Sequence, residues 1–389
     1  MNDPRKVCIV TSTRADYGLL QGVMAEVRAN LAMKLQLAVT GTHLSPEFGM
    51  TVNQIEADGF TIDAKVEMLL SSDTAVGIAK SMSLTTAGFA DAFARLRPDI
   101  LVLLGDRYEI LAVAQAALVA RIPIAHIHGG ETTEGAFDEA IRHAITKMAQ
   151  WHFVAAEPYR KRVVQMGEAP ERVLVSGAPG LDHINRTALL DSNALSASLG
   201  MPLGEPLFLV TYHPATLGGM DPLAAQAELL AALDAFPQAS VIYTLPNADP
   251  AGRGMAQQAL AWCEANAHRA RAFQSLGQHR YLSAMALADI TIGNSSSGLI
   301  ETPALKRATV NIGTRQAGRL KAGSVIDAAE SRDGIVQAVT MALSPAFRRS
   351  LPSTVSLYGQ GDAGKQIATA LAGVTLADGK RFFDIEHGY

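Results

Sequence analysis

The chain has 389 residues, of which 48% are hydrophobic and 18% charged, and its formal net charge is −4. This length suggests two domains, the apolar fraction excludes a disordered chain, and the well-mixed charges argue against a nucleic-acid-coating surface. The only two cysteines, Cys8 and Cys263, lie far apart, which argues against a disulfide framework and a cysteine-ligated zinc site. With neither a signal-peptide pattern nor an apolar run of ~20 residues, we expect a cytoplasmic protein without membrane or nucleic-acid partners.

Short β-branched runs alternate with longer stretches of helical spacing through the first half of the chain. The runs cover residues 6–11, 35–41, 99–106, 122–128, 151–155 and 173–177. Near-continuous apolar strands separated by helices are typical of a parallel sheet that is covered on both faces.

The pattern restarts after a Pro/Gly-rich connection at residues 200–206, with runs at 207–212, 240–244, 289–293 and 308–312. We therefore predict two doubly wound α/β domains, at residues 1–185 and 186–360, followed by a helix and tail at 361–389. Ligands of such sheets bind at the carboxyl ends of the strands, so two sets of strand ends that face a common cleft would suit a sugar nucleotide.

The loop after the first strand contains Arg14 and Asp16 among small residues. Free backbone N–H groups and a guanidinium make it a candidate anion cradle, while the structural alternative is a helix cap by Ser12 or Thr13 with a surface Arg–Asp pair. The chain contains neither the dinucleotide G-x-G-x-x-G in this loop nor a G-x-x-x-x-G-K-[ST] sequence, so NAD and P-loop chemistry are unsupported.

Asp106 and Arg107 follow the most hydrophobic strand, where charged groups are costly unless they are paired or face a cleft. We favour an active-site role over a purely structural pair.

The next predicted strand ends in HIHGGE at residues 126–131, and alternation would place His126 and His128 on one face. A metal site is one interpretation of this pattern. The other makes Glu131 and Asp138 acid/base groups, because proton transfer on two faces of a substrate needs two titratable groups. For Asp138 the structural alternative is a helical i,i+4 ion pair with Arg142.

In the second half, His213 follows the first strand, and GNSSSG at residues 293–298 joins a strand to a helix that contains Glu301. Hydroxyls and N–H groups at a helix N-terminus bind phosphate oxygens, and a carboxylate one turn later suits a ribose. Arg315 and Arg319 add two guanidiniums after the next strand. Together these residues predict a diphosphate–ribose site, with a plain helix cap as the alternative.

The constellation resembles the hydrolysing UDP-N-acetylglucosamine 2-epimerases of sialic and related nonulosonic acid biosynthesis. The matching motifs run in family order from about residue 6 to 372: TRADYG (13–18), TGTHLSPEFG (40–49), GDRYE (105–109), HIHGGE (126–131), DEAIRHAITKMA (138–149), HPAT (213–216), GNSSSG (293–298) and GTRQAGR (313–319).

The resemblance implies a two-Rossmann, glycosyltransferase-B-like fold with the active site in the interdomain cleft. It also implies loss of UDP together with the proton on carbon 2 to give a 2-acetamidoglucal, then addition of water at carbon 1 and reprotonation from the opposite face. The products would be UDP and N-acetylmannosamine, with no cofactor and no metal. The implied partners are the UDP-sugar and further copies of the chain in a homodimer or homotetramer.

Residue roles carry over by motif position. The positions implied as catalytic are Asp16, Asp106, His128, Glu131, Asp138 and His213. The positions implied as substrate-binding are Arg14, His43, Arg107, Arg142, Ser295, Ser296, Glu301 and Arg315. Some family members have Glu where this chain has His128, so either His128 or Glu131 takes that acid/base role, and Gly18 stands where some relatives have a serine.

Four alternatives stay open. The first is the same chemistry on UDP-2,4-diacetamido-2,4,6-trideoxyglucose for legionaminic acid; UDP-N-acetylglucosamine is preferred from the sequence. The second is a glycosyltransferase on the same fold, which would transfer to an acceptor without exchange at carbon 2. The third is a non-catalytic sugar-nucleotide sensor, against which the set of acids argues. The fourth is a histidine metalloenzyme, which a chelator would inactivate.

Overall fold

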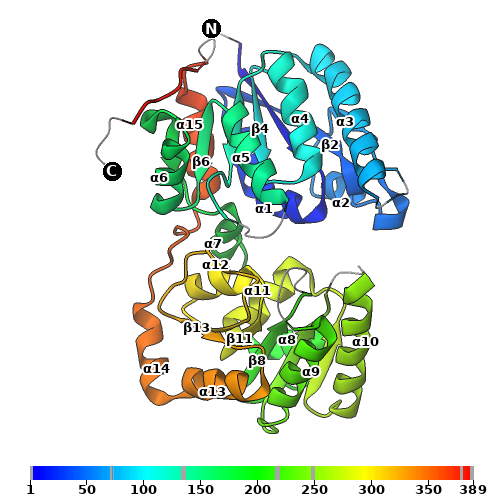
Figure 1. Ribbon diagram of the computed structural model, residues 1–389, viewed down its shortest axis with the longest axis vertical. Coiled ribbons are helices and arrows are strands. Elements are labelled where there is room, and N and C mark those ends of the chain that lie inside the picture. Colours follow the sequence, from blue (N-terminus) through cyan, green and yellow to red (C-terminus); the bar gives the residue numbers. More distant parts are fainter. Residues whose placement is uncertain are drawn as a thin grey trace. The chain divides into compact units, whose positions relative to one another are not determined.

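The structure, a computed structural model, describes residues 3–70, 72, 74–132, 137–214, 220–246, 250–376 and 380–385. The chain divides into two compact units, of which unit 1 comprises Met1–His183 and Tyr358–Tyr389 and unit 2 comprises Ile184–Leu357 (Figure 1). Unit 1 is therefore discontinuous in sequence, because residues 358 onward, including the predicted terminal helix, return to it.

Unit 1 contains a seven-stranded parallel sheet in the order β3-β2-β1-β4-β5-β6-β7. Its strands are β1 (Arg5–Thr11), β2 (Met33–Thr40), β3 (Ala64–Val66), β4 (Ile100–Leu104), β5 (Ile124–Ile127), β6 (Trp151–Val154) and β7 (Val173–Val175). Its helices are α1 (Arg14–Ala29), α2 (Val52–Ala57), α3 (Ala75–Leu96), α4 (Tyr108–Val119), α5 (Asp138–Met148), α6 (Glu157–Gln165) and α15 (Ala363–Gly373). α7 (Asp182–Arg186) lies where the chain leaves the unit, and short 3-10 turns occur at η1 (Gly41–Leu44), η2 (Pro46–Phe48), η3 (Pro170–Arg172) and η4 (Pro179–Leu181).

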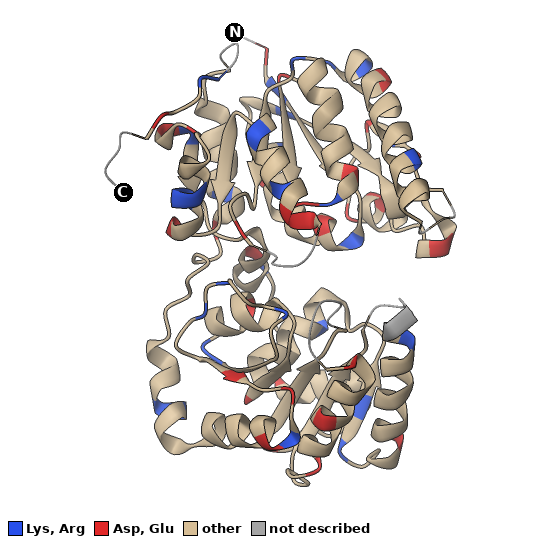
Figure 2. Cartoon of the chain, in the orientation of Figure 1, with Lys and Arg blue, Asp and Glu red and all other residues tan. Residues whose placement is uncertain are grey.

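Alternation along β1 separates the two faces of this sheet. Val7 and Ile9 join a core with α1 and α15, whereas Cys8 and Val10 join a second core with α3, α4 and α5. The charged residues at the N-terminal ends of α4 and α5 gather beside the carboxyl ends of the strands (Figure 2). The fold therefore brings the polar loops after β1, β4 and β5 to one edge.

α15 packs on α1, and Asp182 fastens it there. The Asp182 carboxylate accepts hydrogen bonds from the N–H groups of Ala363 and Gly364 at 2.8 and 2.7 Å. A Cβ on Gly364 would come within 2.9 Å of the Gly22 main chain, so only glycine permits this approach. The first turn of α15 thus has a buried carboxylate from another part of unit 1, as the helix dipole favours.

The end of the chain also contacts unit 1. The Lys380 ammonium donates to both oxygens of the buried Glu168 at 2.7 Å, and Lys147 and His152 bind the same carboxylate. Burial alone would raise the pKa of Glu168, but these hydrogen bonds outweigh it and lower the pKa to about 2. The Phe382 ring lies over Gly167, at the C-terminal side of α6.

Unit 2 contains a six-stranded parallel sheet in the order β10-β9-β8-β11-β12-β13. Its strands are β8 (Leu207–Thr211), β9 (Ser240–Thr244), β10 (Ala270–Phe273), β11 (Ile290–Gly293), β12 (Ala308–Ile312) and β13 (Val325–Ala328). Its helices are α8 (Ser192–Leu199), α9 (Pro222–Leu233), α10 (Pro250–Ala265), α11 (Gly277–Leu287), α12 (Ser297–Ala304), α13 (Arg332–Leu343) and α14 (Pro345–Ser350), with a 3-10 turn at η5 (Leu351–Ser353).

One face of this second sheet packs against α9, α10 and α13, and the other against α8 and α11. Two parallel-sheet, Rossmann-like units confirm the predicted fold class. Among the described residues, no helix has the length and apolarity needed to cross a membrane.

Candidate functional site

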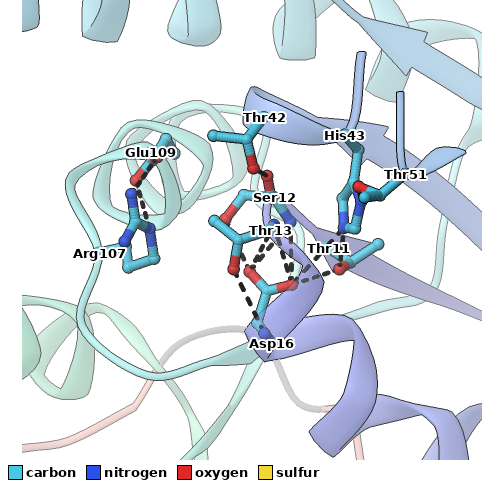
Figure 3. Close-up of polar contacts among 9 residues, drawn as sticks. All are labelled: Thr11, Ser12, Thr13, Asp16, Thr42, His43, Thr51, Arg107 and Glu109. Carbon is cyan, nitrogen blue, oxygen red and sulfur yellow. Dashed lines mark hydrogen bonds and ion pairs between the residues drawn. The ribbon is translucent and has the colours of Figure 1, made fainter. Parts of the chain in front are cut away.

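The Asp16 carboxylate organises the loop between β1 and α1 (Figure 3). It accepts hydrogen bonds from the N–H groups of Ser12 and Thr13 at 3.0–3.2 Å, from the Ser12 hydroxyl at 2.7 Å, and from the Thr11 hydroxyl. Thr13 caps α1 in return, completing a reciprocal capping box. Burial alone would raise the pKa of Asp16, but His43 and these donors outweigh it and hold the pKa below its ordinary value.

His43 lies behind this carboxylate, with no exposed surface. Its Nε2 is 2.9 Å from the Thr11 hydroxyl oxygen, and its Nδ1 is 2.7 Å from that of Thr51. Because Thr11 gives its proton to Asp16, His43 donates to Thr11 through Nε2. The family resemblance implies a substrate contact for His43; in the structure it contacts Thr11 and Thr51 beside Asp16. Arg14, the first residue of α1, is exposed.

Arg107 stands at the N-cap position of α4 and forms a two-pronged ion pair with Glu109 at 2.8 and 3.1 Å (Figure 3). The Glu109 carboxylate is fully buried, whereas the Arg107 side chain remains about half exposed. The Arg107 guanidinium thus neutralises the buried Glu109 carboxylate, and part of it stays exposed beside the carboxyl end of β4.

Asp106 is held by Arg142 of α5. One nitrogen of the Arg142 guanidinium binds the Asp106 carboxylate, and the other donates to the Glu131 carbonyl and to Glu139, both at 2.9 Å. The Arg142 side chain is only 3% exposed. This one buried cation therefore connects the segments that contain Asp106, Glu131 and Glu139. From the sequence, an i,i+4 ion pair between Asp138 and Arg142 is the structural alternative for Asp138. In the structure, Arg142 forms its ion pairs with Asp106 and Glu139 instead.

His126 and His128 do not share a face of the sheet as strand alternation predicts. His126 lies within β5, fully buried, and hydrogen-bonds to the Gly105 carbonyl at 2.8 Å and to Thr146 at 3.1 Å. Burial lowers the pKa of His126 to about 3, so the ring is neutral. His128 follows the end of the strand with a φ of 66°, in the left-handed region, which breaks the alternation.

The His128 ring pairs with Glu131. Its Nδ1 is hydrogen-bonded to the Glu131 carboxylate, and its buried Nε2 has no hydrogen-bond partner in the described part of the chain. A ring held through one nitrogen with the other available is the arrangement of an oriented acid/base group. The described residues include no group of three or more His, Cys, Asp or Glu side chains placed to hold a metal ion.

Asp138 is the first residue of α5 and is partly buried. Burial raises the pKa of Asp138; the nearby Arg107 opposes this effect and Glu109 adds to it. A carboxyl with a raised pKa keeps its proton closer to neutral pH than an ordinary aspartate, as proton-transfer catalysis requires.

In unit 2, Asn294 joins the ends of β8 and β11. Its side chain accepts a hydrogen bond from the His213 N–H and donates one to the His213 carbonyl, both at 2.8 Å. Gly293 has a φ of 140°, and a Cβ there would collide with the Thr211 carbonyl. Glycine is therefore required where the loop turns against β8. Ala215 and Thr216, the rest of the HPAT motif, lie outside the described residues.

The serine loop begins α12, with Ser296 at the N-cap position. The carbonyl of Asn294 accepts hydrogen bonds from Arg315 at 2.9 Å and from Gln316 at 2.8 Å, which tie the loop after β12 to the loop after β11. Burial, and then the neighbouring cation Arg319, lower the pKa of Arg315. The two guanidiniums create a positive potential at this edge of the unit 2 sheet, and a positive potential stabilises a bound anion.

Within each unit, the structure therefore brings the predicted residues together at the carboxyl edge of the sheet. In unit 1 these are Arg14, Asp16, His43, Asp106, Arg107, His128, Glu131, Asp138 and Arg142; in unit 2 they are His213, Ser295, Ser296, Glu301 and Arg315. Sequence reasoning missed the supporting residues Thr51, Glu109 and Asn294. It also missed Tyr281 of α11, whose hydroxyl lies 2.8 Å from that of Ser297 at the start of α12. Of these, Asn294 and Glu109 lie inside the quoted motifs and were open to detection; Thr51 and Tyr281 carry no local signal.

Comparison with known proteins shows which family the chain resembles. A family model described as UDP-N-acetylglucosamine 2-epimerase matches residues 25–372. A GDP/UDP-N,N'-diacetylbacillosamine 2-epimerase (hydrolyzing) of Campylobacter jejuni is 44% identical over 323 residues, which cover 83% of this chain and 84% of that protein. The polysialic acid biosynthesis protein P7 of Escherichia coli is 36% identical, with coverage of 91% and 90%.

A UDP-N,N'-diacetylbacillosamine 2-epimerase (hydrolyzing) of Legionella pneumophila is 33% identical over 376 residues, which cover 96% of this chain and 97% of that protein. Among solved structures, UDP-GlcNAc 2-epimerase from Neisseria meningitidis bound to UDP-GlcNAc matches with a TM-score of 0.81 at 18% identity, covering 94% of this chain and 99% of that one. This likeness shows the fold.

The fold and these matches define an enzyme, a hydrolysing UDP-sugar 2-epimerase. The chain belongs to the UDP-N-acetylglucosamine 2-epimerase family, which confirms the resemblance found in its motifs.

Proposed function

We propose that this enzyme acts on UDP-N,N'-diacetylbacillosamine, which is UDP-2,4-diacetamido-2,4,6-trideoxyglucose, and releases UDP and the 2-epimeric free sugar. The observation that carries this choice is the 44% identity to the Campylobacter jejuni protein, whose name specifies that sugar. The Legionella pneumophila relative has the same sugar in its name. The motifs alone favour UDP-N-acetylglucosamine. We now prefer the alternative substrate, UDP-2,4-diacetamido-2,4,6-trideoxyglucose.

UDP-N-acetylglucosamine, with N-acetylmannosamine as product, is the second candidate. The family description and the polysialic acid relative favour it. The two sugars share the 2-acetamido group and differ at carbons 4 and 6, so the chemistry at carbons 1 and 2 is the same for both.

In the proposed reaction, a base removes the carbon-2 proton while the bond from carbon 1 to the UDP oxygen breaks, giving UDP and a 2-acetamidoglucal. Water then adds to carbon 1, and an acid returns a proton to the opposite face of carbon 2. Two proton carriers on different faces and an anion site for the leaving diphosphate are therefore needed.

We assign the proton transfers to Asp138 and to His128 held by Glu131. The raised pKa of Asp138 and the available Nε2 of His128 support these roles. Asp106, which Arg142 holds in place, is assigned to a sugar hydroxyl and His213 to the leaving group. Asp16 shapes the first loop, with His43 behind it and with Arg14 and Arg107 toward the substrate.

In unit 2, we assign Ser295, Ser296 and Arg315 to the diphosphate and Glu301 to the ribose. The helix N-terminus and the two guanidiniums beside it support an anion there. No cofactor or metal takes part in this scheme. A cytoplasmic location and a homodimer or homotetramer remain predictions.

The test is proton NMR in deuterated water, with the purified enzyme and no added metal or NAD. Each sugar is supplied as its UDP derivative, and the diacetamido sugar also as its GDP derivative. We expect free UDP and a manno-configured sugar deuterated at carbon 2, formed fastest from UDP-N,N'-diacetylbacillosamine. Faster turnover of UDP-N-acetylglucosamine would reverse the substrate assignment. Release of UDP without deuterium would contradict the carbon-2 chemistry, and transfer only to an added acceptor would indicate a glycosyltransferase.

A further inference from the structure

A row of five hydroxyl groups runs beneath the serine loop of unit 2. Ser295 Oγ lies 3.0 Å from Ser297 Oγ, which lies 2.8 Å from Tyr281 Oη. Tyr281 Oη is 3.1 Å from Thr211 Oγ1, which is 2.6 Å from Thr244 Oγ1. Five parts of unit 2 contribute to this row: β8, β9, α11, the loop before α12 and the first residue of α12.

The row has a direction because each hydroxyl has one proton. Ser297 donates to Ser295 through both its hydroxyl and its N–H. Tyr281 therefore donates to Ser297, and Thr211 donates to Tyr281. Thr244 can donate either to Thr211 or to the Val210 carbonyl 3.1 Å away. Burial raises the pKa of Tyr281, so its hydroxyl keeps the proton that the row requires.

The polarised row ends at Ser295, which accepts from Ser297 and whose side chain also hydrogen-bonds with Tyr281. A hydroxyl that already accepts two hydrogen bonds is a stronger donor to an anion, since hydrogen bonds in a row reinforce one another. Arg315 and Arg319 place positive charge at the same edge.

We propose that Tyr281 is a positioning residue for the leaving diphosphate: it orients and polarises the Ser295 hydroxyl through Ser297 so that the serine donates to a phosphate oxygen. The inference rests on the proposed UDP site in unit 2. It adds to that site a residue that acts through Ser297 and Ser295 and that belongs to none of the motifs quoted above.

The test is the Tyr281→Phe variant, which keeps the ring that packs on the core of this face and removes the hydroxyl. We expect the Kd for UDP to rise roughly tenfold, because the Ser295 hydroxyl is no longer oriented and polarised as a donor to the phosphate, while the Kd for uridine is unchanged. Tyr243→Phe is the matched control: Tyr243 is fully buried in the same unit, and its hydroxyl contacts Gln226 at 3.3 Å. Both Kd values should stay at wild-type levels in that control.

A double-mutant cycle makes the test specific. Ser297→Ala should weaken UDP binding to a similar degree, and Tyr281→Phe in the Ser297→Ala background should add little, because both variants break the same row. Additive effects, an unchanged Kd for UDP, or equal losses for UDP and uridine would each overturn the inference. Wild-type protein that binds no UDP would overturn the proposed function and this inference together, whereas wild-type binding with an unaffected Tyr281→Phe variant would overturn only the inference.

Discussion

The guanidinium of Arg142 binds the carboxylate of Asp106, so the acid that follows β4 is held in place by the helix that follows β5. The same side chain donates to the Glu131 carbonyl, next to the group that fixes His128. One buried cation therefore sets the relative positions of two candidate catalytic segments in unit 1.

This relationship predicts the effect of Arg142→Lys. A lysine ammonium is a point charge on a flexible stem and lacks the planar fork that reaches three partners. We expect kcat to fall on the order of 100-fold, the usual cost of displacing a catalytic group by about 1 Å. The Kd for UDP should change little. The control is Arg332→Lys, whose ion pair with Asp333 is exposed; equal kcat values in the two variants would contradict the prediction.

A second prediction concerns the pH dependence that Asp138 confers. The Glu109 charge raises the pKa of Asp138, so Glu109→Gln should lower it. The limb of the pH profile of kcat/KM that reports Asp138 should therefore move to lower pH, by less than about one unit. This direction holds whether Asp138 acts as the acid or the base.

The companion variant, Asp138→Asn, identifies that limb. It should lose the limb and about 10²- to 10⁴-fold of the turnover, the usual contribution of one acid/base group, with UDP binding retained. A Glu109→Gln profile that coincides with that of the wild type would argue against Asp138 as the titrating group.

A third prediction concerns the stability that Asp16 contributes. Its pKa in the folded protein lies below the ordinary value of 3.8, so the ionised carboxylate stabilises unit 1 above that pH, and the effect is lost as the pH falls through the folded pKa. Asp16→Asn should therefore lower the free energy of unfolding at pH 7 by about 1–3 kcal/mol. The difference from the wild type should shrink below about pH 4.

Urea unfolding followed by circular dichroism at pH 7, 5 and 3.5 measures this difference. Asp91→Asn removes one exposed charge from α3 and should leave the stability unchanged at each pH. A constant difference between Asp16→Asn and the wild type across the series would show that the carboxylate does not stabilise the fold through its ionised form.

A fourth prediction tests the contact between the C-terminal residues and unit 1. Gly167 and Gly59 have similar positive φ values, 86° and 79°, but a Cβ on Gly167 would collide with the Phe382 ring, whereas a Cβ on Gly59 would meet open space. Gly167→Ala should displace Phe382 and weaken the Lys380–Glu168 pair. Limited trypsin digestion should then cleave after Lys380 and Arg381 roughly three- to tenfold faster, while Gly59→Ala cleaves at the wild-type rate. Equal rates in both alanine variants would attribute the effect to backbone strain alone.

The strands that carry the candidate site are predictable from sequence because they are mainly apolar runs, buried throughout except at the first two residues of β1. β1, β4, β5, β8 and β11 all end where the apolar pattern ends. β3, β10 and β13 are missed. β3 has only three residues, and β10 and β13 include partly exposed positions, so their pattern is weak. Pairing with a neighbouring strand, which is a long-range effect, makes these segments strands.

The supporting contacts are harder to predict for the same reason. His43 lies in a recognisable motif, yet its burial depends on Thr11 and Thr51, which come from other segments. Asp138 and Arg142 have the helical i,i+4 spacing, but Arg142 pairs with Asp106, which lies 36 residues away in the sequence. Local spacing identifies which side chains are near the strand ends, and the tertiary fold decides which of them bind one another.

The return of the chain from unit 2 to α15 has a consequence for the order of events during synthesis. Unit 2 is continuous from Ile184 to Leu357, so all of its strands have left the ribosome before the helix that completes the first core is made. Until residues 363–373 emerge, the face of α1 that α15 covers stays open to solvent, and the Asp182 carboxylate lacks its two N–H donors. Although domains generally fold in N-to-C order during translation, the second unit of this enzyme is able to reach its native state first. A gene fragment that ends at residue 183 would therefore yield an unfinished domain with an exposed apolar surface.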